Sequence, residues 1–175
     1  LILAAPAVWG DDTFSPVYRF ALWMGAHTVP WLNVSGGHLD IQVTDNIKVL
    51  RKLSRDPLMI HEARLDTLYG LVGLMDRALK ASARIRLPAL VQYGLHDEVV
   101  PRRSVCSMLA RMNDRPAVAF YPHGYHLLMR DLHAEQVWKD MAAWIHSRAV
   151  TSTGGTVTAV CGSQDTGAAA HAAAP

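Results

Sequence analysis

The sequence of 175 residues is long enough for one domain with a hydrophobic core, and 50% of its residues are hydrophobic. The formal net charge is only +2 and the basic residues are scattered, which argues against nucleic acid as a partner, because phosphate binding requires a concentrated basic patch. No apolar run approaches the roughly 20 residues that a helix needs to cross a bilayer.

Two cysteines, Cys106 and Cys161, are too few for a disulfide framework, and the second lies in a segment without hydrophobic periodicity. We therefore expect reduced thiols and a cytoplasmic protein. The sequence opens on an apolar run, residues 1–5, without an initiator methionine and without the basic region of a signal peptide. This opening inside a strand-like run suggests that the sequence is part of a longer one.

The apolar run over residues 1–5, which ends at a proline, predicts a central parallel strand that is covered on both faces. About eighty residues of helical character follow. Ser15 and Pro16 predict the start of a short, very apolar helix that extends to Met24, because serine is a favourable cap and proline suits the first helical turn.

The next stretch, residues 25–37, is rich in turn residues. A helix capped by Thr44 or Asp45 is expected to end near residue 56. The clearest helix is predicted over residues 65–79, where apolar side chains recur at the helical period. Two glycines weaken this helix locally and suggest a close packing contact at Gly70 and Gly73.

After residue 86 the pattern changes to short apolar runs that alternate with amphipathic stretches. We expect a strand over 87–93, a helix from Pro101, a strand over 117–121 and a long helix from about residue 127 to 148. This order predicts parallel βαβ units that close right-handed. The last residues, 150–175, are rich in Thr, Ser, Gly and Ala without periodicity, and we expect a disordered tail or at most a nascent helix.

Two predicted strand ends carry the residues that could perform chemistry. Asp97 follows the strand that ends near Tyr93, and His126 follows the next strand. In a parallel sheet, catalytic groups gather at the carboxyl ends of strands, so these two side chains should be neighbours. A carboxylate that accepts the ring N–H of a histidine fixes its tautomer and stabilises the imidazolium. Taken alone, Asp97 could instead cap a helix and His126 could be a solvated helix residue, but together they favour an acid–base pair.

Other residues in the same loops are weaker candidates. His123 could replace His126 as the base, and Glu98 could replace Asp97 as the acid. A metal site built from His96 and its neighbours is disfavoured, because neither a His-x-His nor a His-Glu-x-x-His spacing is present. We therefore expect no metal.

Four stretches resemble the α/β-hydrolase superfamily, most closely its monoacylglycerol lipase and lysophospholipase branch, the serine aminopeptidase-like hydrolases: residues 1–7, 54–57, 88–101 and 126–131. The similarity spans about residues 1–148. It implies the C-terminal part of an α/β-hydrolase fold, with parallel strands, flanking helices and a helical cap insertion. By this resemblance residues 1–7 and 86–149 form the core and residues 8–85 form the cap. Asp97 and His126 become the acid and base of a catalytic triad, with no metal or organic cofactor.

The sequence departs from that family pattern in one important respect. The family places its nucleophilic serine in a Gly-x-Ser-x-Gly elbow before the acid and the base, and no such elbow is present. The nearest string, residues 33–37, lacks the first glycine, so we interpret Ser35 as a turn serine. The His-Gly motif that this family carries ahead of its nucleophile, and that helps form the oxyanion hole, is absent too. Both elements are expected upstream of Leu1, and the chain alone is expected to be inactive.

The expected activity of the intact protein is the hydrolysis of carboxylic esters such as monoacylglycerols or lysophospholipids. An aminopeptidase or amidase of the same fold remains an alternative, as does a noncatalytic hydrolase-like binding protein. The cap is rich in aromatic residues, which favours an apolar, lipid-like substrate and leaves room for transient contact with a membrane surface. Trp23, Trp31 and Tyr69 are candidate substrate-binding residues, although for any single one of them a place in the helix core is the favoured interpretation. The oligomeric state is left open.

Overall fold

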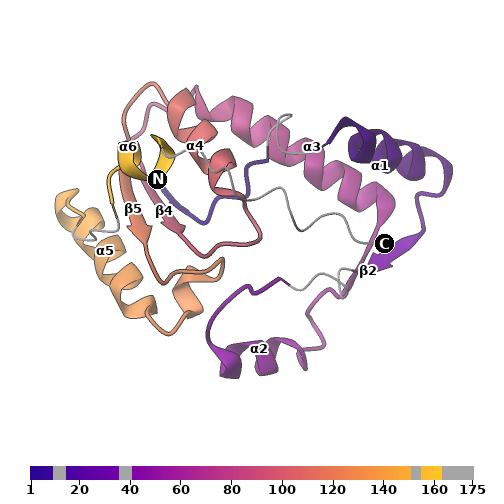
Figure 1. Ribbon diagram of the computed structural model, residues 1–175, viewed down its shortest axis with the longest axis horizontal. Helices are drawn as coiled ribbons and strands as arrows, with labels where there is room; N and C mark the ends of the chain where they lie inside the picture. The colour runs from indigo at the N-terminus through magenta and orange to yellow at the C-terminus, as the bar shows by residue number, and fades with distance from the viewer. Residues whose placement is uncertain (10–14, 36–40, 151–154, 163–175) are drawn as a thin grey trace.

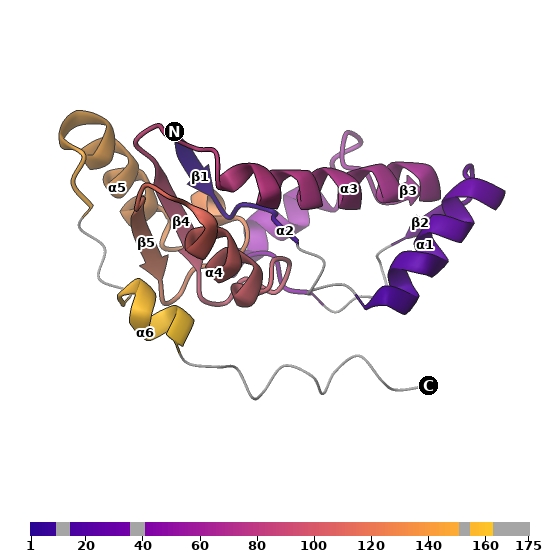
Figure 2. The ribbon, with the colours of Figure 1, turned by 90° about the horizontal axis from the view of Figure 1, so that it is seen from above.

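The chain is described by a computed structural model over residues 1–9, 15–35, 41–150 and 155–162. Its centre is a parallel sheet in the order β1-β4-β5 (Figures 1 and 2), made of β1 (Ile2–Ala4), β4 (Leu90–Gly94) and β5 (Ala117–Tyr121). All five residues of β4 are buried, because the strand has a neighbour on each side and helices on both faces. This confirms the parallel α/β arrangement that the apolar runs predict.

Helices cover the two faces of the sheet, as the views of Figures 1 and 2 both show. One apolar cluster joins the sheet to α4 (Arg102–Arg111), to α6 (Val157–Gly162) and to the end of α3 (Leu65–Ser82). The other cluster joins the opposite face to α5 (Ala134–Ser147). The side chains of β4 therefore point alternately into one cluster or the other, as the pleat of a strand requires.

The residues between β1 and β4 form a helical lobe, and α3 runs from the sheet to the outer end of this lobe (Figure 1). In Figures 1 and 2, α1 (Pro16–Thr28) lies against the end of α3 that is far from the sheet. An ion pair joins these helices, because Arg19 Nη2 lies 2.5 Å from Asp76 Oδ2. This pair is partly buried, so it contributes more to the packing of the two helices than an exposed pair would.

Two features of this lobe differ from the sequence predictions. The turn-rich stretch contains β2 (Asn33–Ser35), which pairs antiparallel with β3 (Glu62–Arg64). The close packing expected at Gly70 is wrong, since a Cβ there would meet nothing within 4 Å. The tight contact lies at Gly25 instead, where a Cβ would come within 2.9 Å of Leu65 Cδ1.

The long C-terminal helix begins later than the predicted residue 127. A 3₁₀ turn, η1 (Leu128–Arg130), comes first, and α5 starts at Ala134. The cause is a competing acceptor, because the backbone N–H of Leu132 donates to Asp45 Oδ1 at 2.8 Å rather than to a helical carbonyl. Asp45, which lies 87 residues away from Leu132 in the sequence, thus delays the start of α5.

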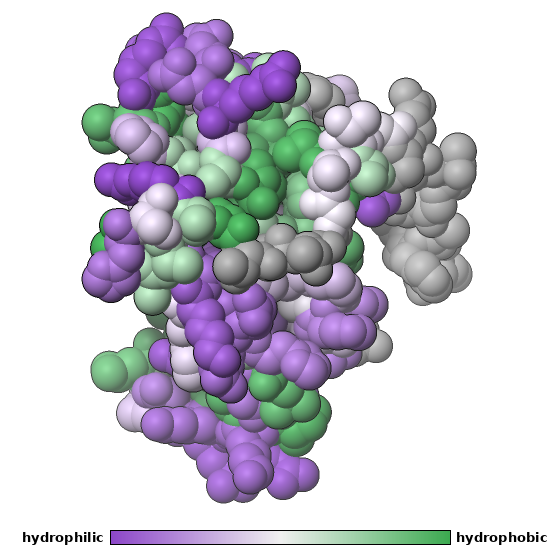
Figure 3. Space-filling model, turned by 90° about the vertical axis from the view of Figure 1, so that its left-hand side faces the viewer, coloured by the Kyte–Doolittle hydropathy of each residue, from purple (hydrophilic) through white to green (hydrophobic). Residues whose placement is uncertain are grey.

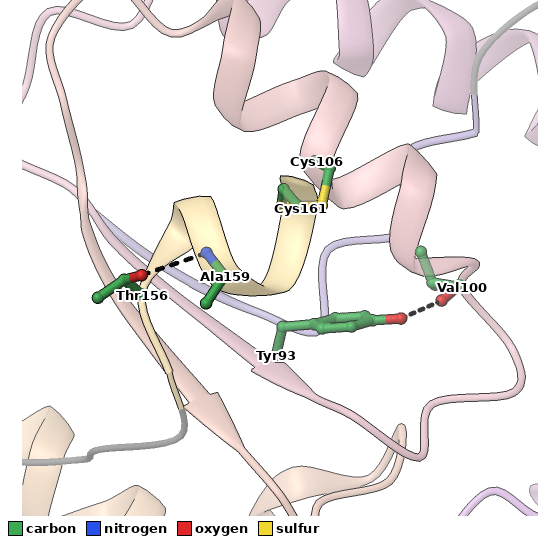
Figure 4. The surroundings of a disulfide bond; sticks show 6 residues. All are labelled: Tyr93, Val100, Cys106, Thr156, Ala159 and Cys161. Atoms are coloured by element: carbon green, nitrogen blue, oxygen red, sulfur yellow. Dashed lines mark hydrogen bonds between the residues drawn. A yellow bond between two sulfur atoms is a disulfide. The ribbon is translucent and has the colours of Figure 1, made fainter. Parts of the chain in front are cut away.

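The expected reduced thiols are wrong, and the part of the expected tail that the structure describes contains a short helix, α6, rather than only disordered chain. Cys106 on α4 and Cys161 on α6 form a disulfide with a Cα–Cα distance of 5.6 Å (Figure 4). Val160 is buried in the core cluster beside this bond, so α6 has an apolar anchor of its own. Residues 151–154 and 163–175 of the expected tail lie outside the described residues.

Within the described ranges, no helix is both long enough and apolar enough to pass through a membrane. The surface is nevertheless not uniformly polar. Figure 3 views the end of the molecule that carries α5, where apolar residues gather between more hydrophilic regions. Exposed apolar side chains on or next to α5 include Trp138 and Ile145.

The Cys106–Cys161 bond predicts a clear difference in stability between oxidised and reduced protein. It closes a loop of 55 residues, and removing such a cross-link should lower the free energy of unfolding by roughly 2–4 kcal/mol. Urea denaturation of the oxidised protein and of Cys106→Ser measures this loss. The Cys161→Ser variant and the double variant should lose the same free energy of unfolding as Cys106→Ser, because all three variants lack the same disulfide bond. Equal stability with and without reducing agent would contradict the disulfide.

Candidate functional site

The carboxylate of Asp97 is fixed by the loop that follows β4. Its Oδ1 accepts hydrogen bonds from the backbone N–H groups of Val99 and Val100, both at 2.9 Å. The hydroxyl of Tyr93 donates to the carbonyl of Val100 at 2.7 Å, which ties the same loop back to the strand (Figure 4). The Asp97 side chain is 0% exposed, so these donors replace the water that a buried carboxylate needs.

His126 lies against this carboxylate. Its Nδ1 is 2.9 Å from Asp97 Oδ2, while 23% of the His126 side chain stays exposed. With Asp97 ionised, the ring must carry its proton on Nδ1 to make this bond, which leaves the lone pair on Nε2. This is the arrangement of a histidine base that a carboxylate orients.

A close approach of two backbones brings these two loops together. The N–H of His96 donates to the carbonyl of Gly124 at 2.9 Å. A Cβ on Gly94 would overlap the backbone carbonyl of Gly124 and lie 2.7 Å from the carbonyl oxygen of Tyr125. Only a residue without a side chain fits at Gly94, because backbone atoms cannot rotate out of the way.

Asp131 is a further buried acid next to this pair, and sequence reasoning assigned it no role. Its Oδ2 accepts from the backbone N–H of Tyr125 at 2.8 Å, and its Oδ1 accepts from the hydroxyl of Thr44 at 2.5 Å. Burial raises the pKa of the Asp131 carboxyl, with smaller contributions from the charges of Asp45 and Asp97, although the two hydrogen bonds oppose the shift. Thr44 was a predicted helix cap, but Asn46 caps α2 (Ile47–Leu53) instead.

The competing candidates lie outside the pair. The ring of His123 lies 5.4 Å from that of His133, and Glu98 Oε2 accepts the backbone N–H of Gln42 at 2.7 Å. The ring of His96 stacks on Tyr125, with 5.4 Å between centroids. Within the part of the chain that the structure describes, no group of three His, Cys, Asp or Glu side chains could hold a metal ion.

The three predicted substrate-binding residues all belong to the helical lobe. Trp23 and Tyr69 both contact the ring of His27, at centroid distances of 4.9 and 5.5 Å, where α1 meets α3. Trp31 follows α1 and is two-thirds exposed. Ser35, expected in a turn, instead ends strand β2 opposite Glu62, in the small sheet of this lobe.

Residues 1–133 match the model of the family described as serine aminopeptidase, S33. The fold is also similar to two solved structures. One is the crystal structure of a monoacylglycerol lipase from Paleococcus ferrophilus, at 18% identity and a TM-score of 0.72. The other is a soluble variant of monoglyceride lipase from Saccharomyces cerevisiae in complex with a substrate analogue, at 15% identity and a TM-score of 0.67. Each match covers 85% of this chain, which spans only 58% and 55% of those two chains.

The contact between the two loops predicts a strong effect of one added methyl group. Gly94→Ala should destabilise the protein by roughly 1–3 kcal/mol, because its Cβ collides with backbone, and it should separate Asp97 from His126. Gly70→Ala is the matched control. It adds a methyl group in open space on a helix, so its stability should rise by up to about 1 kcal/mol. Thermal unfolding compares the two, and equal effects would refute the contact.

Proposed function

This chain belongs to the serine aminopeptidase S33 family of hydrolases, and from that premise we propose that the protein which contains it hydrolyses carboxylic esters. Asp97 and His126 are its acid and base, and the nucleophilic serine lies upstream of residue 1. The observation that carries this proposal is the contact of 2.9 Å between a fully buried carboxylate and a partly exposed imidazole at neighbouring strand ends. Residues 8–85 act as the cap over the site.

The proposed reaction uses His126 twice. Its Nε2 takes the proton of the serine hydroxyl while the serine oxygen attacks the acyl carbonyl. Asp97 holds the ring through Nδ1 and stabilises the imidazolium that forms. Collapse of the tetrahedral intermediate breaks the ester bond, and the imidazolium protonates the leaving alkoxide. Water then attacks the acyl-enzyme with His126 again as base, and the second tetrahedral intermediate releases the fatty acid as His126 returns the proton to the serine oxygen. Residues 1–175 alone lack the nucleophile and should not perform these steps.

The proposed substrates are monoacylglycerols or lysophospholipids. Two findings support an apolar acyl ester: both solved structures named above are described as lipases for monoglycerides, and the cap exposes aromatic side chains. Phe20 and Trp23 stack on α1 with 5.8 Å between centroids, and both are about half exposed. Such a surface suits transient contact with a lipid aggregate. The family description favours a second candidate, an aminopeptidase.

The compartment also belongs to this proposal. The cytoplasmic location was inferred from free cysteines, and the bond between Cys106 and Cys161 removes that argument. Disulfides persist in oxidising compartments, so we favour such a compartment for the folded protein. Protein isolated from its source in the presence of an alkylating agent tests this, because the agent modifies only reduced cysteines. Alkylation of both Cys106 and Cys161 would argue for the cytoplasm.

Substitution of the pair tests the mechanism in the complete protein. His126→Ala and Asp97→Asn should each lower kcat on a soluble ester about 10⁴-fold, the first by removing the base and the second by favouring the wrong tautomer. His123→Ala is the matched control, since its ring faces His133 rather than Asp97, and it should keep nearly full activity. Full activity in His126→Ala would overturn the assignment. A serine-directed fluorophosphonate that fails to label the complete protein would favour a noncatalytic role.

A comparison of substrates tests the specificity. We expect the complete protein to hydrolyse a long-chain monoacylglycerol faster than an aminoacyl amide, because the exposed cap surface is apolar. Phe20→Ser should slow hydrolysis of the aggregated monoacylglycerol but leave the rate on a soluble short-chain ester unchanged. A preference for the aminoacyl amide would make the protein an aminopeptidase. Equal rates of Phe20→Ser and the parent on aggregates would exclude this surface from lipid contact.

A further inference from the structure

A short segment of the helical lobe, residues 42–46, runs along the loop that carries His126; we call it the clasp segment. It has no regular secondary structure, and its polar groups are used in contacts with two parts of the core. Three backbone or side-chain groups of the clasp segment bond residues just after His126: the Val43 carbonyl accepts from Leu127 N, Asp45 Oδ1 accepts from Leu132 N, and Asn46 Nδ2 donates to the Arg130 carbonyl.

Two hydrogen bonds fix the backbone on either side of His126. On one side, the N–H of Tyr125 donates to Asp131 Oδ2 at 2.8 Å. On the other side, the N–H of Leu127 donates to the carbonyl of Val43 at 2.9 Å. The backbone N–H groups of the residues before and after His126 therefore both donate to acceptors outside the sheet.

Thr44 and Asp131 connect these two supports. The Thr44 hydroxyl donates to Asp131 Oδ1 at 2.5 Å, and it accepts from the N–H of Asn46 at 3.2 Å. Thr44 is 0% exposed and Asp131 is 5% exposed. A buried carboxylate that loses one of its donors is costly, so this pair has one favourable arrangement.

The clasp segment also reaches the loop of the acid. The backbone N–H of Gln42 donates to Glu98 Oε2 at 2.7 Å, and Glu98 directly follows Asp97 in the sequence. One short segment of the lobe therefore bonds both loops that meet at the contact between Asp97 and His126. A displacement of this segment would disturb hydrogen bonds to both loops.

We propose that the Thr44–Asp131 pair positions His126 against Asp97, so that the helical lobe holds the base in its reactive orientation as well as covering the site. This inference rests on the proposed function for its catalytic readout. Neither residue touches substrate or the reacting atoms, so both are positioning residues. Effective positioning depends on displacements smaller than 1 Å, and such a loss costs up to about 100-fold in rate.

The test is Thr44→Val in the complete protein, because valine keeps the shape of threonine and removes the hydroxyl. We expect kcat on a soluble ester to fall at least about tenfold, while KM changes less than about twofold. Thr44→Ser restores the hydroxyl and should recover most of kcat. Thr28→Val is the matched control, since it removes a hydroxyl that donates to the carbonyl of Met24 on an exposed helix, and its kcat should not change.

Asp131 supplies a second, independent measurement. Asp131→Ala removes both acceptors, and the double variant with Thr44→Val should lose no more kcat than Asp131→Ala alone, because the two residues act as one unit. Proton NMR gives a readout that a purely structural role would not move: the downfield Nδ1–H signal of His126 should broaden or shift in Thr44→Val and persist in Thr28→Val. Asp114→Ala, at an exposed acid, controls for the loss of a charge.

The outcomes separate this inference from the proposed function. If His126→Ala abolishes hydrolysis while Thr44→Val keeps the parent kcat and the parent Nδ1–H signal, the positioning role is refuted and the proposed function stands. The same conclusion follows if Thr44→Ser is as impaired as Thr44→Val, or if the losses of the double variant multiply. If His126→Ala keeps full activity, the proposed function fails; the NMR signal then still shows whether Thr44 positions the ring.

Discussion

Contact between the backbones of two loops sets the geometry on which the candidate site depends. Strands β4 and β5 pair in parallel over all five residues of each, so their carboxyl ends stop side by side. At the end of β4, Gly94 approaches Gly124 of the next loop so closely that a side chain on Gly94 would overlap backbone. Asp97 follows Gly94 by three residues, and His126 follows Gly124 by two. The 2.9 Å contact between these side chains is thus a consequence of main-chain packing, and side-chain flexibility contributes little to it.

The parts of the fold that could be predicted from the sequence are those with a strong local pattern. β4 and β5 are short apolar runs with an amphipathic helix between them. This order predicts a right-handed parallel βαβ unit. From that arrangement alone, Asp97 and His126 had to lie at neighbouring strand ends, and the structure places them there. The prediction needed only the direction of each strand, because a parallel sheet collects its loops at one edge.

The parts that could not be predicted depend on partners far away in the sequence. Cys106 and Cys161 are 55 residues apart, and Val160, which is buried in the core, brings Cys161 next to α4. The sequence does not indicate this packing. The late start of α5 is set by Asp45, a residue of the helical lobe, through the N–H of Leu132. Strands β2 and β3 have three residues each and are mostly exposed, so no alternation of apolar and polar residues indicates them.

The same dependence on distant partners changes how the lobe between β1 and β4 should be understood. An insertion that only covered a site could be exchanged for another without disturbing the chemistry below it. Here Thr44 and Asp131, 87 residues apart, share a buried hydrogen bond. The carbonyl of Val43 also accepts a hydrogen bond from the N–H of Leu127, the residue after His126. A lobe of different sequence would have to supply these same groups, or leave the buried Asp131 carboxylate without one of its two donors and the N–H groups of Leu127 and Leu132 without these acceptors. The lobe is therefore tied to the loop that carries His126 through one segment of five residues, so under the proposed positioning role a change in the lobe also changes the support of the base.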